Sequence, residues 1–146
     1  MIDFDIEKLI PHRNRMKLVD RIVEIDAEKA VTISTVKERW PLFKDGCVNP
    51  MVLIEIAAQT AGVYVGWNER KKRNGKFSGK GWLVGIKKAT FYLDRISLNT
   101  RIITSVVKRM EIDHYLQFWG TAKVDSDIIG DVGLQLFWTE GSATSR

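Results

Sequence analysis

Cysteine and histidine are scarce in this chain of 146 residues. The single cysteine, Cys47, cannot form an internal disulfide, which is typical of proteins from a reducing compartment. The two histidines, His12 and His114, do not stand at metal-ligand spacing from Cys47 or from each other, so we expect no metal. The acidic first residues lack the basic and apolar segments of a secretory signal, which favours the cytoplasm. No sequence feature indicates a cofactor.

The composition is that of an ordinary globular protein, with 45% hydrophobic and 28% charged residues. A chain of this length can bury a core of its own. It contains no internal repeat, low-complexity segment or linker between domains. The sequence therefore predicts one domain over residues 1–146, with a mobile tail at 140–146.

Much of the net charge of +5 comes from one short segment of the chain. Its cations are Arg70, Lys71, Lys72, Arg73, Lys76 and Lys80. We interpret the segment as a polar loop, and aromatic residues do not alternate with its cations, which argues against a nucleic-acid site. Two interpretations stay open: a solvated surface, or a docking site for an acidic protein partner.

The longest apolar run, residues 49–67, contains a single carboxylate, Glu55. Asn49 is a good helix N-cap and a proline follows it, so we expect one helix of about 27 Å at 1.5 Å per residue. The spacing places Glu55 and Gln59 on one face. Gly62 and Gly66 continue that side and leave room for another backbone or a slender ligand.

Three interpretations of this helix compete. A membrane span would fit its length, but Glu55 is expensive in lipid, and the amphipathic strands elsewhere would lack a core. A soluble core helix could hold Glu55 in a structural hydrogen bond. The third interpretation makes Glu55 a catalytic acid or base whose pKa is set by apolar surroundings.

The rest of the chain is rich in alternating, strand-like segments. We expect strands at 16–25, 29–37, 82–92, 100–110, 115–124 and 128–138. Their short connections predict antiparallel neighbours. One sheet face is apolar and the lone helix is apolar nearly all round, so we expect the sheet to curl around the helix and a second subunit to cover the remainder.

Several segments resemble bacterial 3-hydroxyacyl-acyl-carrier-protein dehydratases. They are Pro11-His12-Arg13, Leu18-Val19-Asp20-Arg21, Glu55-Ile56-Ala57-Ala58-Gln59 and Gly85-Ile86-Lys87-Lys88-Ala89-Thr90-Phe91. The resemblance implies the hotdog fold, an α+β architecture in which an antiparallel sheet curls around one long helix. It also implies activity on acyl thioesters.

One departure from that family concerns the loop before the helix. Family members usually carry a histidine there, which acts as the base beside the helix carboxylate, whereas residues 42–49 of this chain contain none. A loop of this kind resembles a divergent branch of dehydratase-like hotdog proteins found with aryl-polyene and related lipid-like biosynthesis.

Dehydration of a 3-hydroxyacyl thioester needs two proton carriers and a donor for the developing enolate oxygen. We expect Glu55 to be one carrier, as the acid that protonates the hydroxyl, with Gln59 orienting it or the substrate. Asp45 lies where the family histidine would be and is the candidate base. Backbone N–H groups around Gly46 and Cys47 are the candidate anion hole.

Two further side chains have weaker assignments. The family does not use the histidine of the Pro-His-Arg segment for catalysis, so we expect His12 to make structural hydrogen bonds beside the substrate. Cys47 as a nucleophile would need a nearby base, and a small buried thiol is the simpler interpretation.

The leading hypothesis is a dehydratase-like protein of fatty-acid or polyene-type lipid biosynthesis. Two carboxylates without a histidine also fit a hotdog thioesterase. A third hypothesis is a non-catalytic partner subunit of a dehydratase hetero-oligomer. The expected partners are an acyl carrier protein or a coenzyme A thioester, a second copy, or a paralogue, and docking of the carrier is assigned to Arg70, Lys71, Lys72 and Arg73.

Overall fold

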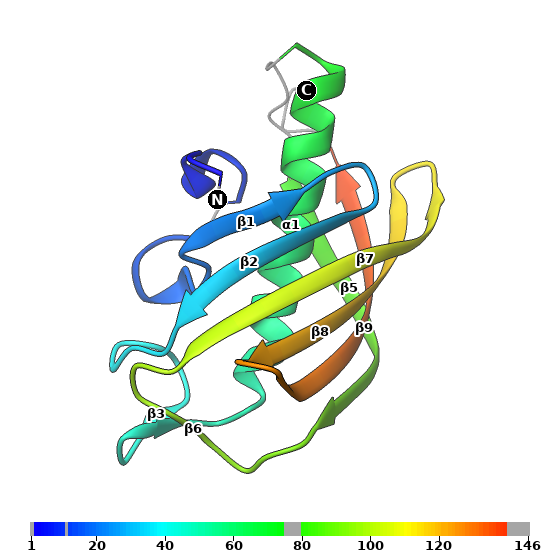
Figure 1. Ribbon diagram of the computed structural model, residues 1–146. Helices are drawn as coiled ribbons and strands as arrows, with labels where there is room; N and C mark the ends of the chain where they lie inside the picture. The colour runs from blue at the N-terminus through cyan, green and yellow to red at the C-terminus, as the bar shows by residue number, and fades with distance from the viewer. Residues whose placement is uncertain (1, 11, 75–79, 140–146) are drawn as a thin grey trace.

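The computed structural model describes residues 2–10, 12–74 and 80–139 (Figure 1). Its strands are β1 (Arg21–Ile25), β2 (Lys29–Thr35), β3 (Phe43–Lys44), β4 (Cys47–Val48), β5 (Lys80–Phe91), β6 (Ile96–Ser97), β7 (Arg101–Ile112), β8 (Tyr115–Val124) and β9 (Asp127–Thr139). Helix α1 spans Val52–Lys72, and the 3-10 helices η1 (Ile6–Lys8) and η2 (Asn14–Met16) lie near the N-terminus. The predicted tail at 140–146, Pro11 and Lys76 lie outside the described residues.

One antiparallel sheet wraps around the helix. Its strand order is β1-β2-β7-β8-β9-β5, and α1 lies in its hollow (Figure 1). A small sheet of β3, β4 and β6 lies near the start of α1. The predicted α+β hotdog architecture is confirmed.

The strand predictions differ most at the first strand. The alternating segment 115–124 coincides with β8, whereas β1 begins only at Arg21 instead of residue 16. The amides of Leu18 and Val19 donate to the side chain of Gln59, so they are not available to a neighbouring strand. A side chain on the helix therefore replaces a strand partner there.

Helix α1 begins at Val52, two residues after the expected first position, and it ends later than expected. The Asn49 side chain accepts a hydrogen bond from the Met51 amide at 2.9 Å, in the turn that leads into the helix. The last turn contains Arg70 and Lys72, so the prediction of a loop there is wrong. Glu69 lies in this turn and forms an ion pair with Lys72 at 3.1 Å, which favours the extra turn. No helix among residues 2–10, 12–74 and 80–139 is long and apolar enough to cross a membrane.

The two glycines of α1 leave room for another segment, and at Gly66 the neighbour is a backbone, as predicted. A Cβ on Gly66 would lie 2.9 Å from the carbonyl oxygen of Leu9, and one on Gly62 would lie 3.2 Å from a methyl group of Ile10. The N-terminal segment therefore packs closely on this side of α1 (Figure 1). Phe4 extends the contact by packing edge-on against Trp67, with ring centroids 5.3 Å apart.

The core lies between the inner face of the sheet and α1. Buried side chains of the helix, among them Leu53, Ile56 and Val63, pack with those of the sheet and of the N-terminal segment. The chain itself thus covers part of the helix surface that we assigned to a second subunit. The apolar character of α1 alone does not require a dimer.

Candidate active site on the central helix

Glu55 and Gln59 lie side by side on α1, as their spacing predicts. The Nε2 atom of Gln59 donates a hydrogen bond to Oε2 of Glu55 at 3.0 Å. Gln59 is fully buried, whereas 36% of the Glu55 side chain is exposed. The amide is therefore part of the core, and the carboxylate lies at its edge.

Gln59 links the helix to the chain that follows η2. Its Oε1 atom accepts hydrogen bonds from the backbone N–H groups of Leu18 at 2.9 Å and Val19 at 3.4 Å. Its Nε2 atom also donates to the carbonyl oxygen of Met16 at 2.6 Å. The orientation of the amide that contacts Glu55 is thus fixed by the backbone of another segment.

His12 contacts the same carboxylate from the N-terminal segment. Its Nε2 atom lies 3.1 Å from Oε2 of Glu55, and 30% of its side chain is exposed. Arg13 holds the backbone around it by donating to the carbonyl oxygens of Glu7, Ile10 and His12, each at 2.8 Å. The partner of His12 in the expected structural hydrogen bond is therefore Glu55, the candidate acid–base residue.

The electrostatics of Glu55 reflect opposing effects. Burial by itself would raise the pKa of Glu55, but the hydrogen bonds from His12 and Gln59, with the charge of His12, outweigh it. The pKa is lowered from the ordinary value of 4.5. Glu55 is therefore ionised at neutral pH, a state that suits a base better than the acid we expected.

Asp45 and Gly46 form the tip of the hairpin between β3 and β4. Both are exposed and have positive φ angles, 53° and 80°, as a tight two-residue hairpin requires. Cys47 is half-buried in β4, which pairs with β3 and β6. Within the described ranges, no hydrogen bond or ion pair joins these three residues to Glu55. A catalytic role for Asp45 stays a prediction.

The amides at the start of α1 are already engaged. The N–H groups of residues 51–54 donate to the Asn49 side chain and to the carbonyl oxygens of residues 49–51. An anion hole on this chain would have to use amides ahead of the helix. A Cβ on Gly46 would have no neighbour within 4 Å, so the hairpin tip is accessible to a ligand.

The predicted carrier-docking residues differ in their surroundings. Lys72 and Arg73 contact Glu69 at 3.1 and 3.6 Å, and the Arg70 guanidinium lies over the Phe4 ring at 5.6 Å. Lys71 is exposed. A groove of about 240 Å³ is lined by Phe4, Trp67, Arg70, Lys71 and Asn74. The groove thus combines the apolar side chains of Phe4 and Trp67 with the cations Arg70 and Lys71.

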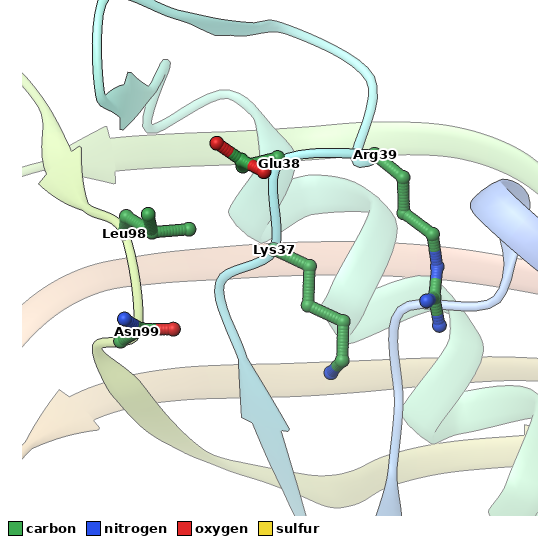
Figure 2. A pocket seen from close by; sticks show the side chains of 5 residues that line it. All are labelled: Lys37, Glu38, Arg39, Leu98 and Asn99. Carbon is green, nitrogen blue, oxygen red and sulfur yellow. The ribbon is translucent and has the colours of Figure 1, made fainter.

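A larger cavity of about 440 Å³ is lined by a different set of residues (Figure 2), of which Leu98 donates a backbone hydrogen bond to the carbonyl oxygen of Gly46 at 3.0 Å. It is lined by Lys37, Glu38, Arg39, Leu98 and Asn99. Lys37 and Arg39 extend to one side of their loop while Glu38 points to the other (Figure 2), and Lys37 forms an ion pair with Asp20 at 3.1 Å. It contains none of the predicted catalytic side chains, so its size does not make it the candidate active site.

A helix that carries an oriented carboxylate inside a curled antiparallel sheet defines a hotdog protein with a candidate acid–base site. Solved structures that share the fold include the dehydratase heterocomplex ApeI:P from Xenorhabdus doucetiae and a mutant thioesterase from Pseudomonas aeruginosa. The first has a TM-score of 0.86 at 19% identity and covers 96% of this chain and 94% of its own. The second has a TM-score of 0.61 at 10% identity, with coverages of 82% and 81%.

Sequence comparison gives the family. The 3-hydroxyacyl-(acyl-carrier-protein) dehydratase FabZ of Thermoanaerobacter pseudethanolicus is 33% identical over 143 residues, which are 93% of this chain and 96% of the relative. The ApeP-like family model, described as ApeP dehydratase, matches residues 4–144. The chain belongs to this ApeP-like dehydratase family, which confirms the predicted dehydratase-like resemblance.

The contact between His12 and Glu55 was not expected from the sequence. One available signal was the pair Gly62 and Gly66, because small residues on the Glu55 side of the helix indicate close approach of another segment. That segment is the one that carries His12.

Proposed function

We propose that this protein dehydrates 3-hydroxyacyl thioesters, with Glu55 as the acid–base group. The observation that carries the proposal is the accessible, ionised carboxylate of Glu55, which two neighbouring side chains orient. Membership in the ApeP-like dehydratase family and the similarity to FabZ support the reaction class.

The proposed reaction moves one proton through Glu55. Its carboxylate removes the proton from the carbon next to the thioester carbonyl, and the electrons of that bond form an enolate. The enolate then forms the carbon–carbon double bond as the bond to the hydroxyl oxygen breaks. The hydroxyl leaves as water with the proton that Glu55 had taken. One carboxyl group thus serves first as base and then as acid, and this scheme replaces the two separate proton carriers of the sequence-based expectation.

The first experiment is incubation with a 3-hydroxyacyl carrier protein and mass spectrometry of the acyl product. We expect loss of one water with the wild-type protein and none with Glu55→Gln. Glu111→Gln is a matched control, because Glu111 is an exposed carboxylate of β7. Release of a free acid would favour the thioesterase alternative, for which the shared fold of the Pseudomonas thioesterase provides some support.

An unchanged thioester in every reaction would refute activity of the isolated chain on that substrate. It would favour the third hypothesis, a subunit that acts only with a paralogue. The solved Xenorhabdus structure, the dehydratase heterocomplex ApeI:P, is a precedent for such an assembly in its own two proteins.

We propose an acyl carrier protein as the partner that delivers the substrate. Lys71 and Arg70 line a groove with an apolar floor, a combination that fits an acidic partner with an apolar contact. The alternative carrier is coenzyme A, and parallel assays with both thioesters separate the two. A cytoplasmic location is part of the same proposal.

We further propose that the chain assembles through the edge strand β5. Among the described strands β5 pairs only with β9, which leaves one side of a 12-residue strand with unpaired backbone groups. Pairing with the same strand of a second copy, or of a paralogue, would satisfy them. Sedimentation of the chain alone and with the paralogue measures which assembly forms.

A further inference from the structure

We infer that His12 is a positioning residue for Glu55. This inference rests on the proposed function. It deepens that proposal by assigning the group that prepares the carboxylate.

The geometry of the carboxylate carries the first step. His12 Nε2 and Gln59 Nε2 lie 3.1 and 3.0 Å from the same atom, Oε2 of Glu55. The other oxygen, Oε1, has no hydrogen-bond partner among residues 2–10, 12–74 and 80–139. Two donors on one oxygen fix the plane of the carboxylate and leave Oε1 for a substrate proton.

The second step concerns the other nitrogen of the ring. Nδ1 of His12 is buried and has no hydrogen-bond partner in the described part of the chain. A histidine that only stabilises a loop commonly uses its ring nitrogens on backbone groups. All hydrogen bonding that the structure gives this ring is therefore directed at Glu55.

The third step is the rigidity of the segment that carries His12. Arg13 donates three hydrogen bonds to backbone carbonyl oxygens, those of Glu7, Ile10 and His12 itself. Leu9 packs against Gly66 with no space for an additional methyl group. The position of His12 relative to α1 is thus set by the fold and not by the substrate.

Other charged groups near this segment have different partners. Glu7 pairs with Arg13 at 3.2 Å and with Lys17 at 3.6 Å. On α1, the uncharged Gln59 is the other neighbour of the carboxylate, and His12 is the titratable side chain in contact with Glu55. A change in the titration of Glu55 can therefore be attributed to His12.

The test compares His12→Leu, which removes the donor, with His12→Gln, whose amide can restore it. We would follow the Glu55 carboxyl by ¹³C NMR across pH and measure the pH dependence of dehydration, with His114→Leu as the matched control. We expect His12→Leu to raise the midpoint of the Glu55 titration and to lower kcat roughly tenfold, and His12→Gln to recover part of both. His114→Leu should change neither.

The outcomes separate this inference from the proposed function. Absence of turnover in the wild type would refute the proposed function, and the NMR titration would still report whether His12 acts on Glu55. A Glu55 midpoint that does not move in folded His12→Leu protein overturns the inference. A second outcome also overturns it: His12→Leu lowers kcat by the same factor at every pH, and His12→Gln does not restore the rate. Such a loss would indicate a purely structural role.

Discussion

Replacement of Gln59 by methionine should reveal how strongly the site depends on one buried amide. Methionine has a similar length and no branch, so it fills the same space without the hydrogen bonds. The Leu18 amide and the Met16 carbonyl oxygen, which lie 2.9 and 2.6 Å from the Gln59 side chain, would lose their partner. The perturbation therefore isolates the polar contribution of the side chain.

The magnitude follows from the groups left unpaired. A buried polar group without a partner costs about 1–3 kcal/mol, and the substitution leaves two strong bonds unmade. Burial of the apolar methionine side chain offsets about 1 kcal/mol of this cost. We expect the free energy of unfolding to fall by about 3 kcal/mol, a large part of the roughly 5–15 kcal/mol that is typical of a domain.

The assay is unfolding in urea at one fixed protein concentration, because assembly adds to the apparent stability. Gln117→Met is the control: Gln117 is only half-buried on β8 and donates to the Tyr115 hydroxyl at 2.8 Å. Water can replace that bond, so we expect a loss under about 1 kcal/mol. A loss for Gln59→Met no larger than that of the control would refute the reasoning.

Three further predictions concern packing, charge and partner binding. Gly66→Ala should lower the free energy of unfolding by about 1 kcal/mol, because strain against the Leu9 backbone exceeds the gain in helix propensity. Gly62→Ala should not lower it, because the new methyl group meets only a side-chain methyl group of Ile10. Equal effects of the two variants on the melting temperature would contradict this prediction. Because its folded-state pKa is lowered, Glu55 stabilises the protein fully above its unfolded pKa and loses that contribution as the pH falls through the folded value. The free energy of unfolding of Glu55→Gln should therefore depend less on pH in the acidic range than that of the wild type. The same pH dependence in both proteins, measured by unfolding in urea, would refute a stabilising contact between Glu55 and His12. Lys71→Glu should weaken carrier-protein binding more at low than at high salt, as measured by calorimetry. An affinity that depends neither on the substitution nor on the salt concentration would refute the docking role.

Local patterns in the sequence are sufficient for most of the fold. Alternation of apolar and polar residues predicts β8 at its observed bounds, and Asn49 with the following proline predicts the start of α1 to within two residues. Both depend on interactions within a few residues, which a sequence displays directly. The segments that resemble the dehydratases add the hotdog arrangement and point to Glu55.

Two contacts depend on the tertiary structure alone: His12 lies beside Glu55, and the Leu18 amide donates to the Gln59 side chain and not to a neighbouring strand. These pairs join segments far apart in the sequence, and no local propensity encodes their distance. They depend on the close packing of the N-terminal segment against Gly66. The sequence by itself determined the helix, most strands and the carboxylate, whereas packing between distant segments decided which side chains orient it.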